Sequence, residues 1–191
     1  MTAAIPKGFE QYCLRCLMRR EMCLCARVPT VQTKVRFLIV QHIVERLRTS
    51  NTGRLAALAL PNSEILEYGG PIPLDPERLA GPGTWLLYPS RSGASGPEPQ
   101  RLIVLDGSWH QSRKMYMRLK PLRDMPCLSL SPPDPNLVRL RRQPRPEAMS
   151  TLEAVAAAVA HFEGEEKARS LFALHDEHAS RILALKGYPR P

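Results

Sequence analysis

Residues Leu102 to Met115 read Leu-Ile-Val-Leu-Asp-Gly-Ser-Trp-His-Gln-Ser-Arg-Lys-Met. The apolar run from Leu102 to Leu105 has no polar alternation, which is typical of a strand buried on both faces of a parallel sheet. Asp106 ends the run, Gly107 permits a sharp turn, and Ser108 is a favoured helix N-cap. Open α/β sheets bind ligands where such a strand ends before a helix, so this stretch predicts both a fold class and a site.

A purely structural interpretation of the same stretch is a strand, an Asp-Gly turn and a capped helix over Trp109 to Leu119. Trp109 favours the site, because a large aromatic side chain just past a tight turn is costly unless it packs against something. We therefore keep both interpretations and expect Trp109 to contact a ligand or to close a pocket.

The remaining patterns alternate between short apolar runs and helical segments, which is typical of an α/β protein with a mainly parallel sheet and flanking helices. The further strands are predicted at 34–41, 63–68, 84–88 and 127–130, and the further helices at 55–60, 151–162 and 165–186. The helix at 151–162 begins with the capping box Ser150-Thr151-Leu152-Glu153. The helix at 165–186 ends before Gly187.

The chain has 191 residues, which is enough for one domain with a small appendage. We expect a cysteine-rich zinc knuckle over residues 1–30 and a catalytic domain over residues 31–191. No segment resembles a signal peptide or a membrane span, so a cytoplasmic protein without a membrane partner is expected. The sequence leaves the oligomeric state open, with a monomer favoured.

The net charge of +9 is unevenly distributed. Basic residues concentrate in 1–60 and in 101–150, and an acidic segment separates these blocks. This segregation predicts a positive face that binds a polyanion such as RNA, although a solvated charge run is the alternative. The proline- and arginine-rich segment 131–149 is the preferred contact loop, because guanidinium groups grip phosphates. The RNA-binding candidates are Arg48, Arg54, Arg113, Lys114, Arg139, Arg141 and Arg142.

Four of the five cysteines, Cys13, Cys16, Cys23 and Cys25, fall close together in a Cys-x2-Cys, Cys-x-Cys pattern. Four thiolates suit a tetrahedral, structural zinc ion with no open coordination position. Two disulfides are the alternative, but they would not persist in a reducing compartment. The distance in sequence between this cluster and Asp106 predicts that metal loss affects the N-terminal segment and RNA affinity more than cofactor binding.

Several motifs together resemble the DTW-domain family of tRNA-uridine aminocarboxypropyltransferases. Asp106-Gly107-Ser108-Trp109 is similar to the family's Asp-x-Thr-Trp signature, with Ser108 in place of threonine. The cysteine knuckle, Asn51-Thr52-Gly53, Tyr88-Pro89-Ser90 and Ser150 to Ala154 also resemble family blocks and occur in family order. The resemblance implies a fold similar to that of the SPOUT methyltransferases, with a C-terminal trefoil knot.

The resemblance further implies transfer of the 3-amino-3-carboxypropyl group of S-adenosylmethionine to N3 of a tRNA uridine, with release of methylthioadenosine. Asp106 is then the catalytic candidate, either as a general base for N3–H or as a group that orients a substrate. The implied S-adenosylmethionine-binding residues are Asn51, Thr52, Tyr88, Pro89, Ser90, Leu105, Gly107, Ser108, Trp109, Ser150 and Glu153.

Two other functions fit the same residues. A SPOUT-type methyltransferase uses the same cofactor and an RNA substrate, and a non-enzymatic zinc-containing module would bind RNA alone. His175 and His178 lie one helical turn apart, but no third ligand is evident, so we interpret them as core histidines.

Overall fold

The computed structural model describes residues 8–89, 98–131 and 148–185. In chain order its elements are η1 (Arg20–Met22), β1 (Arg36–His42), η2 (Ile43–Glu45), α1 (Gly53–Ala59), β2 (Ser63–Tyr68), η3 (Pro76–Leu79), β3 (Thr84–Leu87), β4 (Arg101–Asp106), α2 (Trp109–Arg118), α3 (Lys120–Asp124), β5 (Cys127–Leu128), α4 (Thr151–Glu163) and α5 (Glu165–Leu185). None of the helices in these segments is long and apolar enough to cross a membrane.

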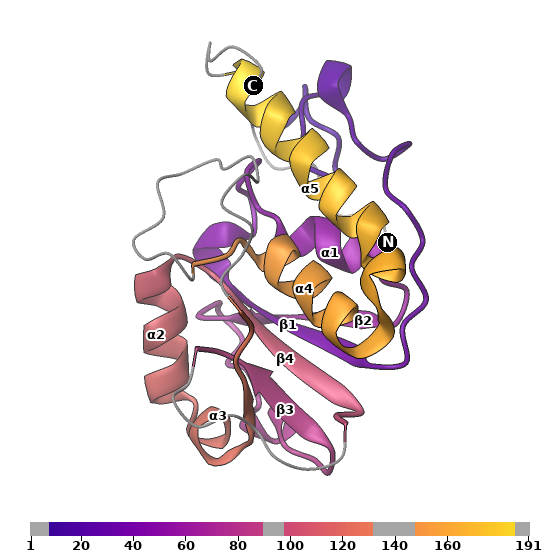
Figure 1. Cartoon of the computed structure of the whole chain (residues 1–191). Helices are drawn as coiled ribbons and strands as arrows, with labels where there is room; N and C mark the ends of the chain where they lie inside the picture. Colours follow the sequence, from indigo (N-terminus) through magenta and orange to yellow (C-terminus); the bar gives the residue numbers. More distant parts are fainter. Residues whose placement is uncertain (1–7, 90–97, 132–147, 186–191) are drawn as a thin grey trace.

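The sheet has five strands in the order β2-β1-β4-β3-β5 (Figure 1). Every pair of neighbouring strands is parallel. The predicted α/β class with a mainly parallel sheet is therefore confirmed, and the strand from the central stretch, β4, lies in the middle of the sheet. Predicted boundaries differ from the observed ones by at most two residues, as expected because apolar patterns do not mark the exact end of an element.

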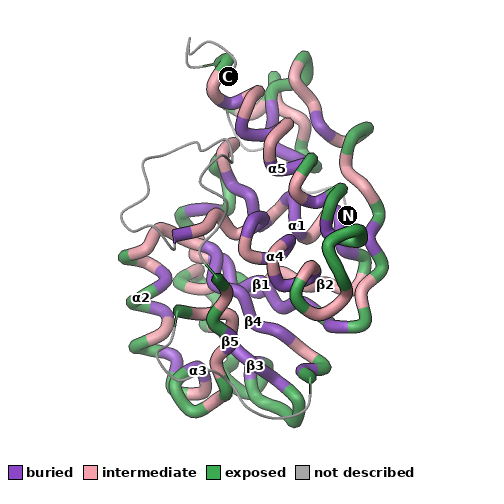
Figure 2. The backbone as a smooth tube through the Cα atoms, viewed as in Figure 1, coloured by how far each residue is buried: buried purple, intermediate pink, exposed green. Residues whose placement is uncertain are grey.

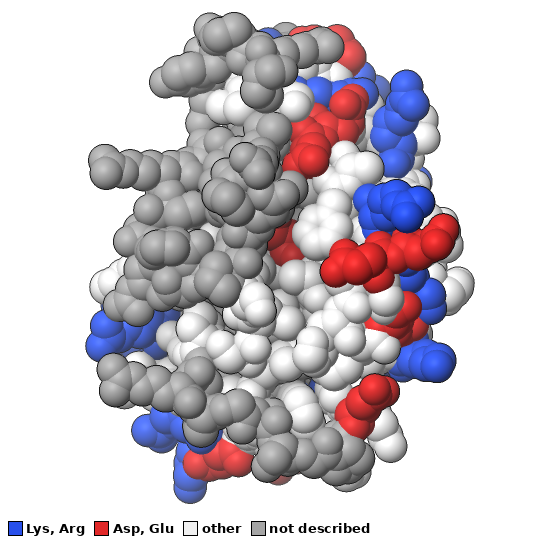
Figure 3. Space-filling view, in the orientation of Figure 1, with Lys and Arg blue, Asp and Glu red and all other residues white. Residues whose placement is uncertain are grey.

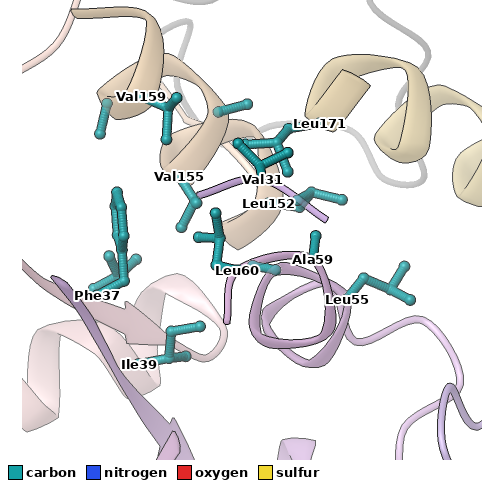
Figure 4. Packing of buried hydrophobic residues seen from close by; sticks show 14 of the residues in the cluster. Val31, Phe37, Ile39, Leu55, Ala59, Leu60, Leu152, Val155, Val159 and Leu171 are labelled. Carbon is teal, nitrogen blue, oxygen red and sulfur yellow. The ribbon is translucent and has the colours of Figure 1, made fainter. Parts of the chain in front are cut away.

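Helices cover both faces of the sheet, and the central strands are accordingly buried (Figures 1 and 2). Phe37 and Ile39 of β1 pack on one face against α1, α4 and α5, as Figure 4 shows at close range. Leu38 and Val40 point to the other face and pack in a second cluster with residues of α2 and α3. Two apolar faces explain why the strands read as continuous apolar runs rather than as alternating ones.

The connections that follow the two central strands place a crevice at their carboxyl ends. After β1 the chain passes to α1 on one face, and after β4 it passes to α2 on the other face. Ligands bind in open α/β sheets where neighbouring strands diverge in this way. Gln41, near the end of β1, lies in register with Asp106, the last residue of β4, so both polar side chains stand at this crevice.

The N-terminal cysteine segment is packed into the main core. Met18 and Leu24 are fully buried in the same apolar cluster as Phe37 and Leu152. The expected division at residue 30 stays a prediction, and any such boundary crosses a shared core. The trefoil knot also stays a prediction, since residues 132–147, which precede α4, lie outside the described segments.

Candidate active site

A pocket of about 300 Å³ occupies the crevice at the carboxyl ends of the central strands. Three blocks that are far apart in sequence meet there: Ser50 to Thr52 before α1, Val104 to Trp109 at the start of α2, and Met149 to Ala154 at the start of α4. Leu87 to Pro89, Leu128 to Leu130 and the single residues Glu45, Ser112 and His175 complete the described walls. The volume suits a ligand of the size of one nucleoside derivative.

Asp106 is the centre of a buried hydrogen-bond network in this pocket. Asp106 is only 3% exposed to solvent. Three side chains donate to the carboxylate: Asn51 Nδ2 to Oδ2 at 2.7 Å, Gln41 Nε2 to Oδ2 at 2.9 Å, and Thr151 Oγ1 to Oδ1 at 2.7 Å. Because both carboxylate oxygens are engaged, the network fixes the starts of α1 and α4 relative to β4.

Gly53 lies directly against this carboxylate. A Cβ atom at Gly53 would stand 2.5 Å from Asp106 Cγ and within 2.8 Å of both oxygens. No side chain fits at such distances, so the close approach of α1 to β4 requires glycine here. In the Asn-Thr-Gly block, Asn51 therefore donates a hydrogen bond to Asp106, and the missing side chain of Gly53 leaves space for the Asp106 carboxylate.

A second buried polar pair lies where α4 and α5 meet at the pocket. Glu153 Oε2 accepts a hydrogen bond from the Ser150 backbone N–H at 2.6 Å, and Ser150 Oγ accepts one from Glu153 N–H at 3.2 Å, so the predicted capping box is confirmed. His175 Nε2 lies 3.5 Å from Glu153 Oε2, and both side chains are 2% exposed. The capping box therefore shapes the pocket wall as well as the helix end.

The described walls of the pocket carry carboxylates, although the whole chain is strongly basic. Its lining includes three carboxylates, those of Glu45, Asp106 and Glu153. No lysine or arginine is among the described residues that line it. Carboxylate side chains on walls without a lysine or arginine repel an anionic ligand and attract a cationic one.

The structure brings the predicted cofactor residues together at this pocket, apart from Ser90, which lies outside the described residues. Those that line it are Asn51, Thr52, Tyr88, Pro89, Leu105, Gly107, Ser108, Trp109, Ser150 and Glu153, together with the catalytic candidate Asp106. Ser108 also closes a capping box with Gln111, which aligns the start of α2 with the pocket. The ligand that these residues bind stays a prediction.

Four residues of the pocket and of the Asp106 network are not among the predicted site residues. Gln41 and Thr151 bond to Asp106, while Glu45 and His175 line the pocket. Gln41 carried a usable signal, because a polar residue near the end of an apolar strand belongs at the ligand edge of a parallel sheet. His175 is buried, as predicted for a core histidine, but it also reaches the pocket wall. Nothing in the local sequence pattern around His175 distinguishes a histidine of the core from one at the pocket wall.

The RNA-binding candidates are divided between different environments. Arg113 and Lys114 are exposed on α2, and Figure 3 shows Lys and Arg side chains along the edge of the molecule where Figure 1 places α2 and α3. Arg48 is exposed and pairs with Glu45. Arg54 is partly buried, and its guanidinium donates to the Arg46 carbonyl oxygen. The remaining candidates, Arg139, Arg141 and Arg142, lie outside the described residues.

The four clustered cysteines have a geometry that fits one tetrahedral metal ion. Their sulfur atoms all lie within 4.8 Å of one another. Cys13 Sγ is 3.6 Å from Cys25 Sγ, and Cys16 Sγ is 3.7 Å from Cys23 Sγ. Four zinc–sulfur bonds of about 2.3 Å place the sulfur atoms about 3.8 Å apart, whereas a disulfide needs about 2 Å. All five cysteines are free thiols.

The backbone and the protonation of this cluster also suit metal binding. Leu17, directly after the second cysteine, has a φ of 56°, a left-handed conformation that costs a non-glycine residue about 1–2 kcal/mol. Burial opposes ionisation of Cys13, but hydrogen bonds from the backbone N–H groups of Cys16 and Arg15 outweigh it and lower the pKa of Cys13 to about 6. Burial raises the pKa of Cys25, with further contributions from the neighbouring thiols. The cluster therefore holds one readily formed thiolate for a metal ion.

His178 fastens α5 to the loop that carries the Asn-Thr-Gly block. It is 1% exposed, and its Nε2 lies 3.2 Å from the Thr49 carbonyl oxygen, as expected if Nε2 carries the proton and donates. Burial lowers the pKa of His178 to about 4, with a smaller contribution from His175, while the Thr49 bond acts in the opposite direction.

This shift predicts a pH-dependent stability. Between pH 6.5 and 4 the unfolded chain binds a proton at His178 that the folded chain does not bind. The free energy of unfolding should therefore fall as the pH decreases through this range, by on the order of 2 kcal/mol from this group. Urea unfolding from pH 7.5 to 4 should show a shallower fall for His178→Gln, whose amide still donates to Thr49. His161→Gln, at an exposed histidine, should follow the wild type, and identical curves for all three proteins would contradict the assignment.

Comparison with known proteins adds independent information on the whole chain. The family model of the DTW domain matches residues 10–183, which include the cysteine cluster, the pocket and most of α5. No solved structure gives a significant match.

Three similar proteins carry the same name. The tRNA-uridine aminocarboxypropyltransferase 2 of Drosophila melanogaster is 28% identical over 222 residues, covering 99% of this chain and 87% of the relative. The proteins of the same name from Macaca fascicularis and Mus musculus are each 27% identical and are covered over 58% and 56% of their lengths. The chain thus spans less than two thirds of the two mammalian relatives.

Proposed function

This chain belongs to the DTW-domain family, and from that membership we propose that it transfers the 3-amino-3-carboxypropyl group of S-adenosylmethionine to N3 of a uridine in tRNA. Methylthioadenosine is the second product. The proposal joins the names of the relatives with the chemistry of the pocket, and the following paragraphs give the residues that support it.

The charge of the pocket is the observation that carries this proposal. Three carboxylates and no lysine or arginine line the described walls, in a chain of net charge +9. S-adenosylmethionine carries a sulfonium, an ammonium and a carboxylate group, so its net charge is positive and its two cationic groups fit walls of this sign. Nucleotide phosphates, which the basic surface attracts, would be repelled from the same walls.

The walls offer separate environments for the parts of this substrate. Val104, Leu105 and Leu128 give apolar contacts, and the half-buried Trp109 offers an aromatic face that attracts a sulfonium by a cation–π interaction. Sulfonium activates three neighbouring carbon atoms, so the product depends on which of them faces the incoming nucleophile. We propose that these walls present the methionine side chain, rather than the methyl group, to the uridine.

Asp106 acts in this proposal as a positioning residue. Three donors already occupy its carboxylate, and both oxygens accept at least one of these hydrogen bonds. Of the two roles considered from the sequence, general base and orienting group, the hydrogen bonds favour the second. Asp106 holds Asn51 and Thr151 at the edge of the pocket, where both face the ligand.

The exposed basic side chains outside the pocket are the proposed tRNA contacts. Arg113 and Lys114 on α2 follow Trp109 by one turn, so they flank the pocket that the uridine must reach. Arg48 is exposed outside the pocket lining and pairs with Glu45, which does line the pocket. Phosphate contacts at these positions would orient the RNA without reading its sequence.

Isotope transfer tests the proposal directly. The protein is incubated with unmodified tRNA and S-adenosylmethionine that is labelled either in the carboxyl carbon or in the methyl group. We expect carboxyl label in the RNA, no methyl label there, and methylthioadenosine as the small product. Methyl label in the RNA together with adenosylhomocysteine would identify a methyltransferase, and transfer of neither label would favour a non-enzymatic RNA-binding module.

A further inference from the structure

The three pocket carboxylates differ in how much of their hydrogen-bonding capacity is already used. Asp106 accepts from three side chains. Glu153 accepts from the Ser150 backbone N–H and faces His175. These bonds lie within the protein and give both carboxylates a structural task, which leaves the third carboxylate, that of Glu45, to be explained.

Glu45 is the last residue of η2, and its side chain is buried at the pocket wall. The side chain is 6% exposed, and the residue lines the pocket. Its Oε1 atom is fully buried and receives no hydrogen bond from the residues that the structure describes. Its nearest charged partner, Arg48 Nε, is 3.5 Å away, so this buried oxygen keeps an unused acceptor position, which is costly in a protein unless a ligand fills it.

The charged neighbour of Glu45 indicates which substrate it faces. Arg48 Nε lies 3.5 Å from Oε1, and the Arg48 side chain is 44% exposed. Glu45 therefore stands where the buried wall passes into a basic, solvent-facing surface. In the proposed reaction the RNA would approach from this surface, and the smaller substrate would fill the enclosed part of the pocket. A phosphate of the incoming nucleotide has access to the guanidinium of Arg48.

We infer that Glu45 is the general base of the reaction, an inference that rests on the proposed function. Glu45 Oε1 accepts the proton of the uracil N3–H, and the electron pair left on N3 forms a bond to the γ carbon of the methionine side chain. The bond between that carbon and sulfur breaks, and its electron pair stays on sulfur. The products are the N3-substituted uridine, neutral methylthioadenosine and a protonated Glu45, which then releases its proton to solvent.

The decisive variant is Glu45→Gln, which keeps the shape of the side chain and removes the basic oxygen. We expect transfer of carboxyl label to tRNA at pH 7 to fall at least about a hundredfold, the usual effect of losing an acid–base group. The dissociation constant of S-adenosylmethionine, measured by calorimetry, and the thermal unfolding midpoint should stay close to the wild-type values. The defect should shrink as the pH rises, because N3–H then ionises without a base.

Two further variants separate catalysis from packing. Glu45→Asp retains a carboxylate and should keep more activity than Glu45→Gln. Glu67→Gln is the matched control, since Glu67 also pairs with an arginine, Arg46, at 3.4 Å, but lies outside the pocket. This control should transfer label at the wild-type rate and with the wild-type pH dependence.

The outcomes separate this inference from the proposed function. A wild type that transfers carboxyl label and a Glu45→Gln variant of similar rate and pH profile would overturn the inference and leave the proposed function standing. Loss of S-adenosylmethionine binding in Glu45→Gln would also overturn it, because Glu45 would then hold the ammonium group of that substrate. A wild type that transfers no carboxyl label overturns both.

Discussion

Replacing Gly53 by alanine should destabilise the protein and remove the proposed transferase activity, although alanine is the better helix former. In an ordinary helix this change stabilises by up to about 1 kcal/mol. Here the added methyl group would meet the Asp106 carboxylate at 2.5 Å. Overpacking of this kind typically costs about 1–3 kcal/mol. The steric cost therefore exceeds the gain in helix propensity.

The damage should extend from the carboxylate to the pocket. If Asp106 moves, Asn51 and Thr151 lose an acceptor that both now reach at 2.7 Å. Each buried donor left without an acceptor costs a further 1–3 kcal/mol, roughly. We therefore expect the free energy of unfolding to fall by at least about 2 kcal/mol, with no detectable S-adenosylmethionine binding at concentrations that saturate the wild type.

Urea unfolding and calorimetric titration measure these two effects, and Gly70→Ala provides the control. A Cβ atom at Gly70 would come no closer than 3.6 Å to a neighbouring atom, which is an ordinary contact. Gly70→Ala should therefore bind and unfold like the wild type. A Gly53→Ala protein that is as stable as Gly70→Ala and still binds the substrate would show that α1 does not need to approach Asp106 so closely.

The sequence was sufficient to predict the sheet, because each parallel strand is a local apolar run with its own turn signals. The run from Leu102 to Leu105, the turn at Gly107 and the cap at Ser108 lie within seven residues, so local rules apply. The strand order does not follow from such rules, since it depends on contacts between distant segments.

The pocket was predicted only in part, for the same physical reason. Recognisable turns or helix caps lie next to Asp106, Asn51 and Ser150, so local motifs identify these residues. Glu45 and His175 lie in segments whose local patterns look like an exposed turn and a core helix face. Their place in the site comes from the packing of η2 and α5 against the crevice, and no single-segment pattern contains that information.

Removal of the metal from the cysteine cluster is the second change for which we expect a large effect. We propose that the purified protein holds one zinc ion per chain. Cys13→Ser should lower the zinc content sharply and reduce the free energy of unfolding by about 3 kcal/mol or more, since metal binding and folding of such a site are coupled. Cys127→Ser, at a half-buried cysteine on β5 far from the cluster in sequence, should retain the zinc ion.

The size of this effect follows from the packing of the cysteine segment. Met18 and Leu24 are buried in the main core, and release of the knuckle would expose them together with their neighbours. Arg181 of α5 adds direct bonds, because its Nη1 donates to the carbonyl oxygens of Met22 at 3.0 Å and Cys23 at 2.9 Å. Loss of the metal therefore weakens one attachment of α5.

The same helix carries this effect to the pocket, contrary to what distance in sequence suggests. His175 lines the pocket, and His178 holds the Thr49 carbonyl oxygen beside the Asn-Thr-Gly block, six and three residues before Arg181 on α5. We therefore expect Cys13→Ser to weaken S-adenosylmethionine binding as well as tRNA binding. Metal analysis, urea unfolding and calorimetry on Cys13→Ser and Cys127→Ser test this order of events. Full S-adenosylmethionine affinity in a zinc-free Cys13→Ser protein would show that α5 keeps its position without the knuckle, and four oxidised cysteines without metal in reducing buffer would refute the zinc site itself.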